Sequence, residues 1–350
     1  MVKDPRTFSN IAGDAGRKLV LVGQSGGTHL GGSLLRAAEK LEIPTSFHDV
    51  QQAKSKIKLL NSIWWRARSK RYPLGHQFEA KILEVVKEER PTHLLTTGLT
   101  PISRRTLERI RYLNTICLHF STDDPWNPKA GSNWHLESLR AYDRVFTPRQ
   151  SNIQQLRDLG CIDVVYLPFG YDRALFDRGL VSEPSVKSGD VLFVGGADPE
   201  RAEFIRAFAR AGLKVTLAGG YWADYPDLAS HSVGLLNSQQ LATATQEHKI
   251  NLCLVRRANR DGHVMRSFEI AAIGGCMLVE DTPEHRAIFG ADGLRVRLFE
   301  TVEQASALAK AMLSDPAERT RLGRAVNEHI KSGGNTYEDR LSFMLSSVSP

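Results

Sequence analysis

The chain has 350 residues, of which 41% are hydrophobic and 24% charged. This composition excludes a disordered or fibrous protein and predicts about two globular domains. The formal net charge is +7, and the whole excess lies between Val50 and Phe78, where seven basic residues and no acidic one occur. Because the rest of the chain is balanced, a nucleic-acid-binding protein, which needs an extended basic surface, is not expected.

Short apolar segments alternate with helical patterns along the chain, which is typical of β-α-β units on parallel sheets. In the first half, strands are expected at residues 18–23, 45–50, 93–98, 115–120, 143–148 and 163–168. A second series is expected at 190–196, 214–220, 250–255, 275–280 and 294–299, followed by helices at 302–313, 316–331 and 337–347. The fold class is therefore α/β, with two Rossmann-like domains facing each other across a cleft.

The weakly apolar stretch between the two series marks a domain boundary. We expect an N-terminal Rossmann-like acceptor domain over 1–176, a linker over 177–189 and a C-terminal Rossmann-like donor domain over 190–335. A C-terminal helix over 336–350 is free to cross back to the first domain. Ligands in such sheets bind beyond the carboxyl ends of the strands, so the chemistry is expected there.

The cellular compartment is indicated by what the sequence lacks. The first residues are polar and charged without the apolar core of a signal peptide, and the longest uncharged apolar run, 270–279, is too short to span a bilayer. The four cysteines, Cys117, Cys161, Cys253 and Cys276, are widely separated and have no metal-ligand spacing. These features predict a cytoplasmic protein with reduced, buried thiols.

In each predicted domain, a glycine-rich turn follows the first strand. Gly26 and Gly27 lie between a strand and a helix, as do Gly195 and Gly196, which Arg201 follows. Glycine lets backbone amides approach an anion at a helix N-terminus, although the spacing is not that of a dinucleotide site. Each pair is alternatively a turn that needs glycine for its geometry, and Arg201 is alternatively a solvent-facing helix residue.

Residues 256–290 form the most informative segment. A loop with Arg256 and His263 leads into a short helix with Arg266 and Glu269, and Gly274 and Gly275 follow before an apolar strand. The basic groups and free helix amides suit a diphosphate, and the carboxylate suits sugar hydroxyls. The pattern therefore predicts a site for a nucleoside-diphosphate sugar. The structural alternative for Glu269 is a surface glutamate paired with Arg266.

The stretch RSFEIAAIGGCMLVED, residues 266–281, resembles the donor-site signature of group 1 (family 4-like) glycosyltransferases. It is most similar to the branch that shares its C-terminal domain with spore-maturation-type glycosyltransferases. Weaker similarity extends over the first glycine turn, residues 141–160, LPFGYDRALF and FVGG. The resemblance implies a GT-B fold and a nucleotide-sugar co-substrate of the UDP or GDP type, with no metal or other cofactor.

By its position in the motif, Glu269 matches the glutamate that in the family binds the donor ribose. Gly274 and Gly275 match the small residues that follow that glutamate. Retaining members of the family usually have a second glutamate eight residues earlier, near the donor sugar, where this chain has Asp261. Even with aspartate at this position, the resemblance favours a reaction that retains the configuration of the donor sugar. The aspartate also supports the alternative of a non-catalytic protein that binds a nucleotide sugar or a partner.

The acceptor side is expected where the strand at 115–120 ends. Asp123 and Asp124 follow this strand and precede Trp126, so either carboxylate is a candidate for acceptor binding or for a general base. The alternative is a turn in which the aspartates cap backbone amides. His119 is a further catalytic candidate, since family members place a histidine near the donor sugar, and its alternative is a core residue.

The basic segment has a helical period and adjacent tryptophans. Its members are Lys54, Lys56, Lys58, Trp64, Trp65, Arg66 and Arg68. Such a composition suits a helix that lies on an anionic membrane surface, or one that holds an anionic acceptor. The structural alternative is an ordinary amphipathic helix with a buried stripe and solvated charges.

We therefore expect a glycosyltransferase of class EC 2.4 that acts on a saccharide, a lipid-linked or a small-molecule acceptor, for instance in polysaccharide biosynthesis. It would be cytoplasmic, and peripheral at the inner face of the membrane if the basic segment binds lipid. A nucleotide-sugar epimerase with the same architecture is a second alternative.

Overall fold

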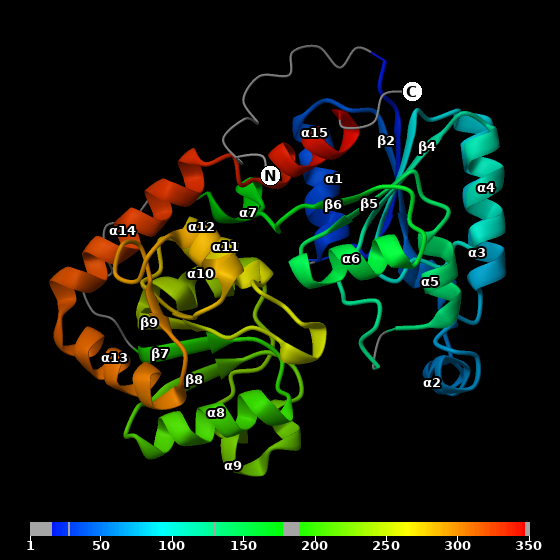
Figure 1. The fold of residues 1–350 in the computed structure, drawn as a ribbon. Coiled ribbons are helices and arrows are strands. Elements are labelled where there is room, and N and C mark those ends of the chain that lie inside the picture. Colours follow the sequence, from blue (N-terminus) through cyan, green and yellow to red (C-terminus); the bar gives the residue numbers. More distant parts are fainter. Residues whose placement is uncertain (1–15, 27–28, 129–130, 178–188, 347–350) are drawn as a thin grey trace. The chain divides into compact units, whose positions relative to one another are not determined.

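The computed structural model describes residues 16–26, 29–128, 131–177 and 189–346. They form two compact units (Figure 1). The N-terminal unit comprises residues up to 168 together with 257–260 and the chain after 336, and the C-terminal unit comprises 169–256 and 261–336. None of the described helices is both long and apolar enough to cross a membrane. Most of the predicted linker, and Gly27, lie outside the described residues.

The N-terminal unit is built on a parallel sheet of order β2-β1-β3-β4-β5-β6. Its strands are β1 (Leu19–Gly23), β2 (Thr45–Asp49), β3 (His93–Thr97), β4 (Ile116–Phe120), β5 (Arg144–Thr147) and β6 (Val164–Tyr166). Every residue of β1, β3 and β4 is buried, as expected for a parallel sheet covered on both faces. All six strands were predicted from the apolar runs.

Helices cover this sheet, and a short 3-10 turn, η2 (Val50–Ala53), follows β2. They are α1 (Leu30–Lys40), α2 (Lys58–Ala67), α3 (Gly75–Glu89), α4 (Arg104–Tyr112), α5 (Asn133–Leu139) and α6 (Gln150–Asp158). The core between sheet and helices includes Val20, Leu94, Ile110 and Tyr142. The Ser103 hydroxyl accepts the amide of Thr106 and so fixes the start of α4.

The C-terminal unit contains the second parallel sheet, of order β11-β10-β9-β7-β8. Its strands are β7 (Gly189–Val194), β8 (Val215–Ala218), β9 (His248–Cys253), β10 (Met277–Glu280) and β11 (Arg297–Phe299). The α-helices are α7 (Arg173–Phe176), α8 (Pro199–Arg210), α9 (Pro226–Ala229), α10 (Ser238–Glu247), α11 (Met265–Ile273), α12 (Pro283–Phe289), α13 (Val302–Ser314) and α14 (Pro316–Ser332), with 3-10 turns η3 (Trp222–Asp224) and η4 (Arg257–Asn259), the latter in the N-terminal unit. The five predicted strands are all present.

The last helix, α15 (Tyr337–Ser346), returns to the N-terminal unit and packs against α1. The rings of Phe146 and Phe343 lie 6.2 Å apart, and Arg340 donates to the carbonyl of Pro168 over 2.8 Å. Burial of Arg340 lowers the pKa of its guanidinium to about 10. The sequence-based expectation that the C-terminal helix crosses back is confirmed.

Candidate functional site

The carboxyl edge of the C-terminal sheet has a topological switch point between β7 and β9, the kind of position at which open α/β sheets bind ligands. The Gly195-Gly196 turn follows β7, and Arg256 follows β9. An added Cβ on Gly196 would find no atom closer than 3.5 Å, and the nearest is an Arg256 guanidinium nitrogen. The turn is half-buried, the amides of Gly195 and Ala197 donate to the carbonyls of Ala218 and Gly220, and the Arg256 guanidinium lies against it.

Arg201 lies at the same turn and is 7% exposed, so it is a buried residue of α8 and the surface alternative is wrong. Its guanidinium donates to the carbonyls of Gly196 and Leu254 over 3.1 and 3.0 Å. Burial, and then the neighbouring Arg256, lower its pKa. Two guanidinium groups therefore meet at one glycine turn, where they are suited to bind an anion, and Asp198 and Asp261 lie within electrostatic range of Arg201.

Helix α11 carries Arg266 in its first turn and Glu269 in the next, and the two side chains form an ion pair. Glu269 is 1% exposed, so the alternative of a surface glutamate is wrong, although its pairing with Arg266 is confirmed. A buried carboxylate is retained only with a charged or hydrogen-bonding partner, and Arg266 is that partner. The pair lies one element after Arg256 in the chain, at the same edge of the sheet.

A buried hydrogen-bonded chain fixes this end of α11, and sequence reasoning did not identify it. Because His285 Nδ1 donates to the Glu280 carbonyl over 2.7 Å, its Nε2 accepts from the Ser267 hydroxyl over 2.8 Å. The Ser267 oxygen in turn accepts the amide of Val264 over 3.2 Å. Burial lowers the pKa of His285 to about 4, so the ring stays neutral and keeps this arrangement.

The other predicted donor residues have distinct places. Gly274 has a φ of 89° and ends α11, and an added Cβ on Gly275 would come within 2.6 Å of Thr245, so helix capping and packing account for both glycines. His263 is buried, and its Nε2 accepts the amide of Phe169 over 3.2 Å, so it does not form an exposed positive rim. Asp261 is half-buried and within electrostatic range of Arg201.

One acidic residue near this site was missed. Glu284, in α12, is 7% exposed, and its carboxylate occupies the position at which a Cβ on Gly262 would lie, so only glycine fits there. The Thr282 hydroxyl donates to the carbonyl of Gly262 beside it. The sequence contained no local signal for this contact because the two segments are separated by β10.

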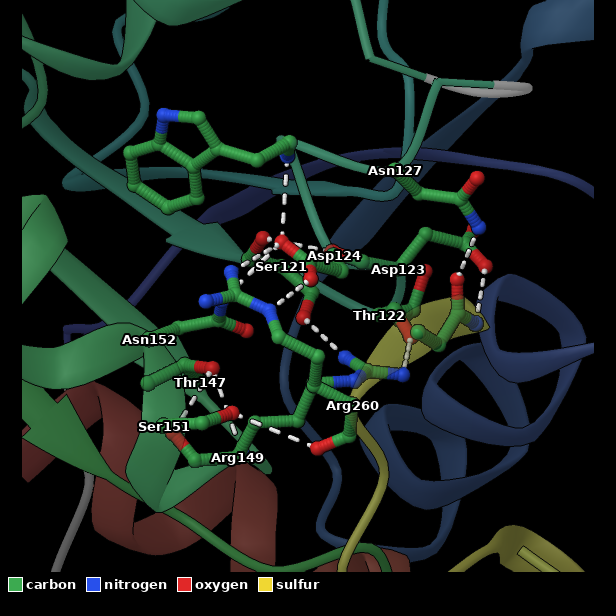
Figure 2. Close-up of polar contacts among 12 residues, drawn as sticks. Ser121, Thr122, Asp123, Asp124, Asn127, Thr147, Arg149, Ser151, Asn152 and Arg260 are labelled. Atoms are coloured by element: carbon green, nitrogen blue, oxygen red, sulfur yellow. Dashed lines mark hydrogen bonds and ion pairs between the residues drawn. The ribbon is translucent and has the colours of Figure 1, made fainter. Parts of the chain in front are cut away.

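In the N-terminal unit, the turn after β4 carries Asp123 and Asp124, and residues 257–260 pack on this turn (Figure 2). Arg260 donates to the Asp124 carboxylate from Nε over 2.6 Å and from Nη2 over 2.9 Å. The Asn152 side chain and the Trp126 amide each donate to the same carboxylate over 3.0 Å. Hydrogen bonds from Arg260 and Trp126 lower the pKa of Asp124 against the opposing effect of its burial.

The neighbouring carboxylate differs in its surroundings. Asp123 is exposed and accepts one longer hydrogen bond, from the Asn259 side chain over 3.3 Å. Asn127 donates to the Asn259 side-chain oxygen over 2.5 Å, and Arg149 supports the turn by donating to the Thr122 carbonyl over 2.8 Å (Figure 2). Of the two aspartates, Asp123 is the one that an acceptor molecule can reach without displacing a cation.

His119 is a fully buried residue of β4 in the structure. Its Nδ1 lies 2.7 Å from the Thr96 hydroxyl, and its ring centroid lies 5.0 Å from that of Tyr142. Burial lowers its pKa well below the ordinary value. These surroundings match the core alternative, and we leave His119 out of the site proposed below.

The remaining acceptor-side candidates are Trp126 and Gly26. Trp126 is half-buried, with the Arg260 guanidinium 5.9 Å from its ring centroid. Gly26 has a φ of 91°, and an added Cβ would meet nothing within 4 Å, so its turn is open. Across the part of the chain that the structure describes, no cluster of three or more histidine, cysteine, aspartate or glutamate side chains is arranged to hold a metal ion.

Comparison with known proteins agrees with the observed architecture. A family model described as "Glycosyl transferase-like" matches residues 201–346, and no curated protein sequence matches the chain. A sucrose-phosphate synthase from Thermosynechococcus elongatus aligns over 95% of this chain and 98% of its own, with a TM-score of 0.66 and 12% identity.

Two ligand complexes are also similar in structure. Anabaena HepE in complex with UDP-glucose aligns over 95% of this chain and 100% of its own, with a TM-score of 0.61 and 13% identity. A Burkholderia xenovorans trehalose-phosphate synthase in complex with glucose 6-phosphate aligns over 94% and 99%, with a TM-score of 0.63 and 13% identity. The two sheets and these likenesses establish the GT-B fold, and the matched region indicates a glycosyltransferase of that type.

Proposed function

We propose that the protein transfers a sugar from a nucleoside-diphosphate sugar to an acceptor hydroxyl. The observation that carries the proposal is the meeting of two guanidinium groups, Arg201 and Arg256, at the Gly195-Gly196 turn. This turn lies at the switch point of the sheet, where a ligand is expected. Two arginine side chains at one place suit a diphosphate.

On the donor side, we assign Glu269 to the hydroxyls of the nucleoside ribose. An ionised carboxylate accepts hydrogen bonds from hydroxyl groups, and the ion pair with Arg266 favours that form. Arg256 and Arg266 would bind the diphosphate, while Arg201, whose donors already hold two carbonyls, fixes the turn and adds charge. The UDP-glucose complex of HepE supports a UDP-sugar as the first donor to test.

During transfer, the bond between the sugar C1 and the diphosphate oxygen breaks, and a bond from C1 to the acceptor oxygen forms. The leaving diphosphate oxygen takes up the electron pair of the broken bond and so gains negative charge, and it accepts the proton that the acceptor hydroxyl loses. Arginines and helix amides directed at that charge lower the barrier. Asp261 is assigned to the donor sugar, with retention of configuration as the favoured course, and Asp123 to the acceptor.

Asp124 is assigned a positioning role. Its four hydrogen bonds occupy the lone pairs that a general base would need, and the ion pair with Arg260 opposes protonation of the Asp124 carboxylate. It holds residues 257–260 and the turn before Trp126. The acceptor itself is proposed as a saccharide, with a phosphorylated sugar favoured by the glucose 6-phosphate complex noted above.

A thermal-shift screen of UDP-, GDP-, ADP- and dTDP-sugars tests the donor assignment. A ligand present at 100 times its dissociation constant stabilises the folded state by about 2.7 kcal/mol, which is readily measured. Nucleotide release with an acceptor present identifies a transferase. A shift without turnover for any sugar acceptor would favour the non-catalytic alternative, and conversion of the sugar without an acceptor would favour the epimerase.

A further inference from the structure

Helix α2 differs from the other long helices of its unit in having no buried residue among those whose side chains are described. By contrast, α1, α3 and α4 each bury several side chains against the sheet. In and just before α2, large aliphatic residues are exposed: Ile57 by 62%, Leu59 by 69%, Leu60 by 37% and Ile63 by 54%. Figure 1 shows α2 at the periphery of the N-terminal unit. The helix therefore presents an apolar surface to the outside.

This exposure is not that of a loose segment, because both ends of α2 are anchored. At its start, the Asn61 side chain accepts the amide of Ser55 and donates to the Ser55 carbonyl, each over 2.8 Å. Beyond its end, the Trp134 indole donates to the Ser69 carbonyl over 3.0 Å. The rings of Trp65 and Tyr72 lie 5.6 Å apart. The aliphatic side chains are thus held outward by the fold.

Cations surround the exposed aliphatic residues, and no acidic residue occurs between Val50 and Phe78. Among the described residues, none of the following cations has a carboxylate partner: Lys54, Lys56, Arg66, Arg68, Arg71 and Arg105. The Arg68 guanidinium lies 5.4 Å from the Trp64 ring centroid, and that of Arg71 lies 5.9 Å from that of Trp134. Several arginines elsewhere in the described residues pair with acidic residues, among them Arg111, Arg206 and Arg297, whereas the cations of this surface are available to external anions.

A pocket of about 780 Å³ lies beside the end of α2. Its lining includes Trp64, Trp134, Arg68, Arg71, Arg104 and Arg105, and also two carboxylates, Glu137, which pairs with Arg104, and Glu79, which accepts hydrogen bonds from Ser103 and Thr106. Three of these arginines are among the cations without a carboxylate partner. Aromatic rings with guanidinium groups around a space of this size suit the phosphate of a lipid headgroup.

We propose that α2 and its surrounding cations dock the protein on an anionic phospholipid membrane. Leu59 and Ile63 enter the interface between headgroups and acyl chains, and the arginines bind lipid phosphates. Charge and exposed apolar area occur together on one anchored helix, and an anionic bilayer satisfies both, whereas a free phosphate or an acidic protein would leave the aliphatic residues in water. The inference does not depend on the proposed transferase activity.

Cosedimentation of the full-length protein with vesicles tests this docking. We expect binding to vesicles of phosphatidylglycerol and phosphatidylcholine at low salt, and much weaker binding to phosphatidylcholine alone. Each basic residue near an anionic surface strengthens partitioning by about fivefold. The triple variant Lys54→Ala, Lys56→Ala, Arg66→Ala should therefore bind about a hundredfold more weakly.

The apolar contribution is tested by Leu59→Ser with Ile63→Ser, which should also weaken vesicle binding at least tenfold. Two matched controls on the C-terminal unit, Val233→Ser with Leu235→Ser and Lys214→Ala with Lys310→Ala, replace exposed residues and should bind as the wild type does. Absence of binding to the anionic vesicles would overturn the proposal. So would a protein that self-associates through α2, detected as a dimer that Leu59→Ser with Ile63→Ser abolishes, without vesicle binding.

Discussion

Replacement of Asp124 by asparagine separates a positioning role from a role as general base. The carboxylate side chain is 2% exposed and accepts hydrogen bonds from Arg260 Nε and Nη2, the Asn152 side chain and the Trp126 amide. Asparagine retains one acceptor oxygen but turns its amide toward Arg260. Because a hydrogen bond to a charged group contributes about 1.5–3 kcal/mol, we expect a loss of about 2–3 kcal/mol in the free energy of unfolding.

The partner residue should matter less. The Arg260 side chain is 38% exposed, so solvent screens its half of the pair, and Arg260→Gln should cost about 1 kcal/mol. The double variant should show a coupling energy of about 1–2 kcal/mol, because both changes disrupt the same interaction. Urea unfolding of the full-length protein, followed by circular dichroism and tryptophan fluorescence, measures all three. Asp123→Asn, the matched control, should change stability by less than about 0.5 kcal/mol, since Asp123 is exposed.

The pH dependence gives an independent check. The pKa of Asp124 is lowered in the folded protein, so its stabilising effect is complete above the unfolded-state pKa of about 3.9 and is lost as pH falls through the folded-state pKa. The stability difference between wild type and Asp124→Asn should therefore shrink below about pH 4. If Asp124→Asn is as stable as the wild type at pH 7 but loses turnover, the positioning role is refuted and Asp124 acts as the general base instead.

Three further outcomes follow from the C-terminal unit. Burial lowers the pKa of His285 to about 4, so below about pH 6.5 the unfolded chain takes up a proton that the folded chain does not. The free energy of unfolding should therefore fall between pH 6.5 and 4. In denaturation measured over this pH range, His285→Gln should remove up to about 3 kcal/mol of that fall. Gly275→Ala should destabilise by about 1–3 kcal/mol through its contact with Thr245, whereas Gly220→Ala, with no atom within 4 Å, should be nearly neutral in thermal melts. Arg256→Ala should weaken donor binding in titration calorimetry by about tenfold or more, through loss of a charged contact, and unchanged affinity would remove Arg256 from the site.

The elements that sequence alone predicted are those with local causes. Most of the strands are short apolar runs, and all eleven were located from the sequence, with ends shifted by a few residues. In the basic segment, Asp49 accepts the amide of Gln51 and starts a 3-10 turn, and the helix begins only at Lys58. Ile57, just before the helix, is 62% exposed.

The contacts that sequence did not predict join residues far apart in the chain. Arg260 pairs with Asp124 across 136 residues, and nothing local to either residue indicates the other. Similarly, Arg201 follows a typical helix start, yet it is buried because its donors reach the carbonyls of Gly196 and Leu254. Motif similarity located Glu269, whereas only the three-dimensional structure shows that it is buried against Arg266.

Calorimetric titration of UDP-glucose, or of the donor that the screen identifies, into wild type and Glu269→Gln tests the central claim most directly. Glu318→Gln is the matched control, because Glu318 also pairs with an arginine three residues away in a helix of the same unit. Loss of charged hydrogen bonds worth about 1.5–3 kcal/mol predicts a dissociation constant raised by about 10- to 150-fold for Glu269→Gln and unchanged for Glu318→Gln. Equal affinity of wild type and Glu269→Gln would contradict the assignment of the donor site.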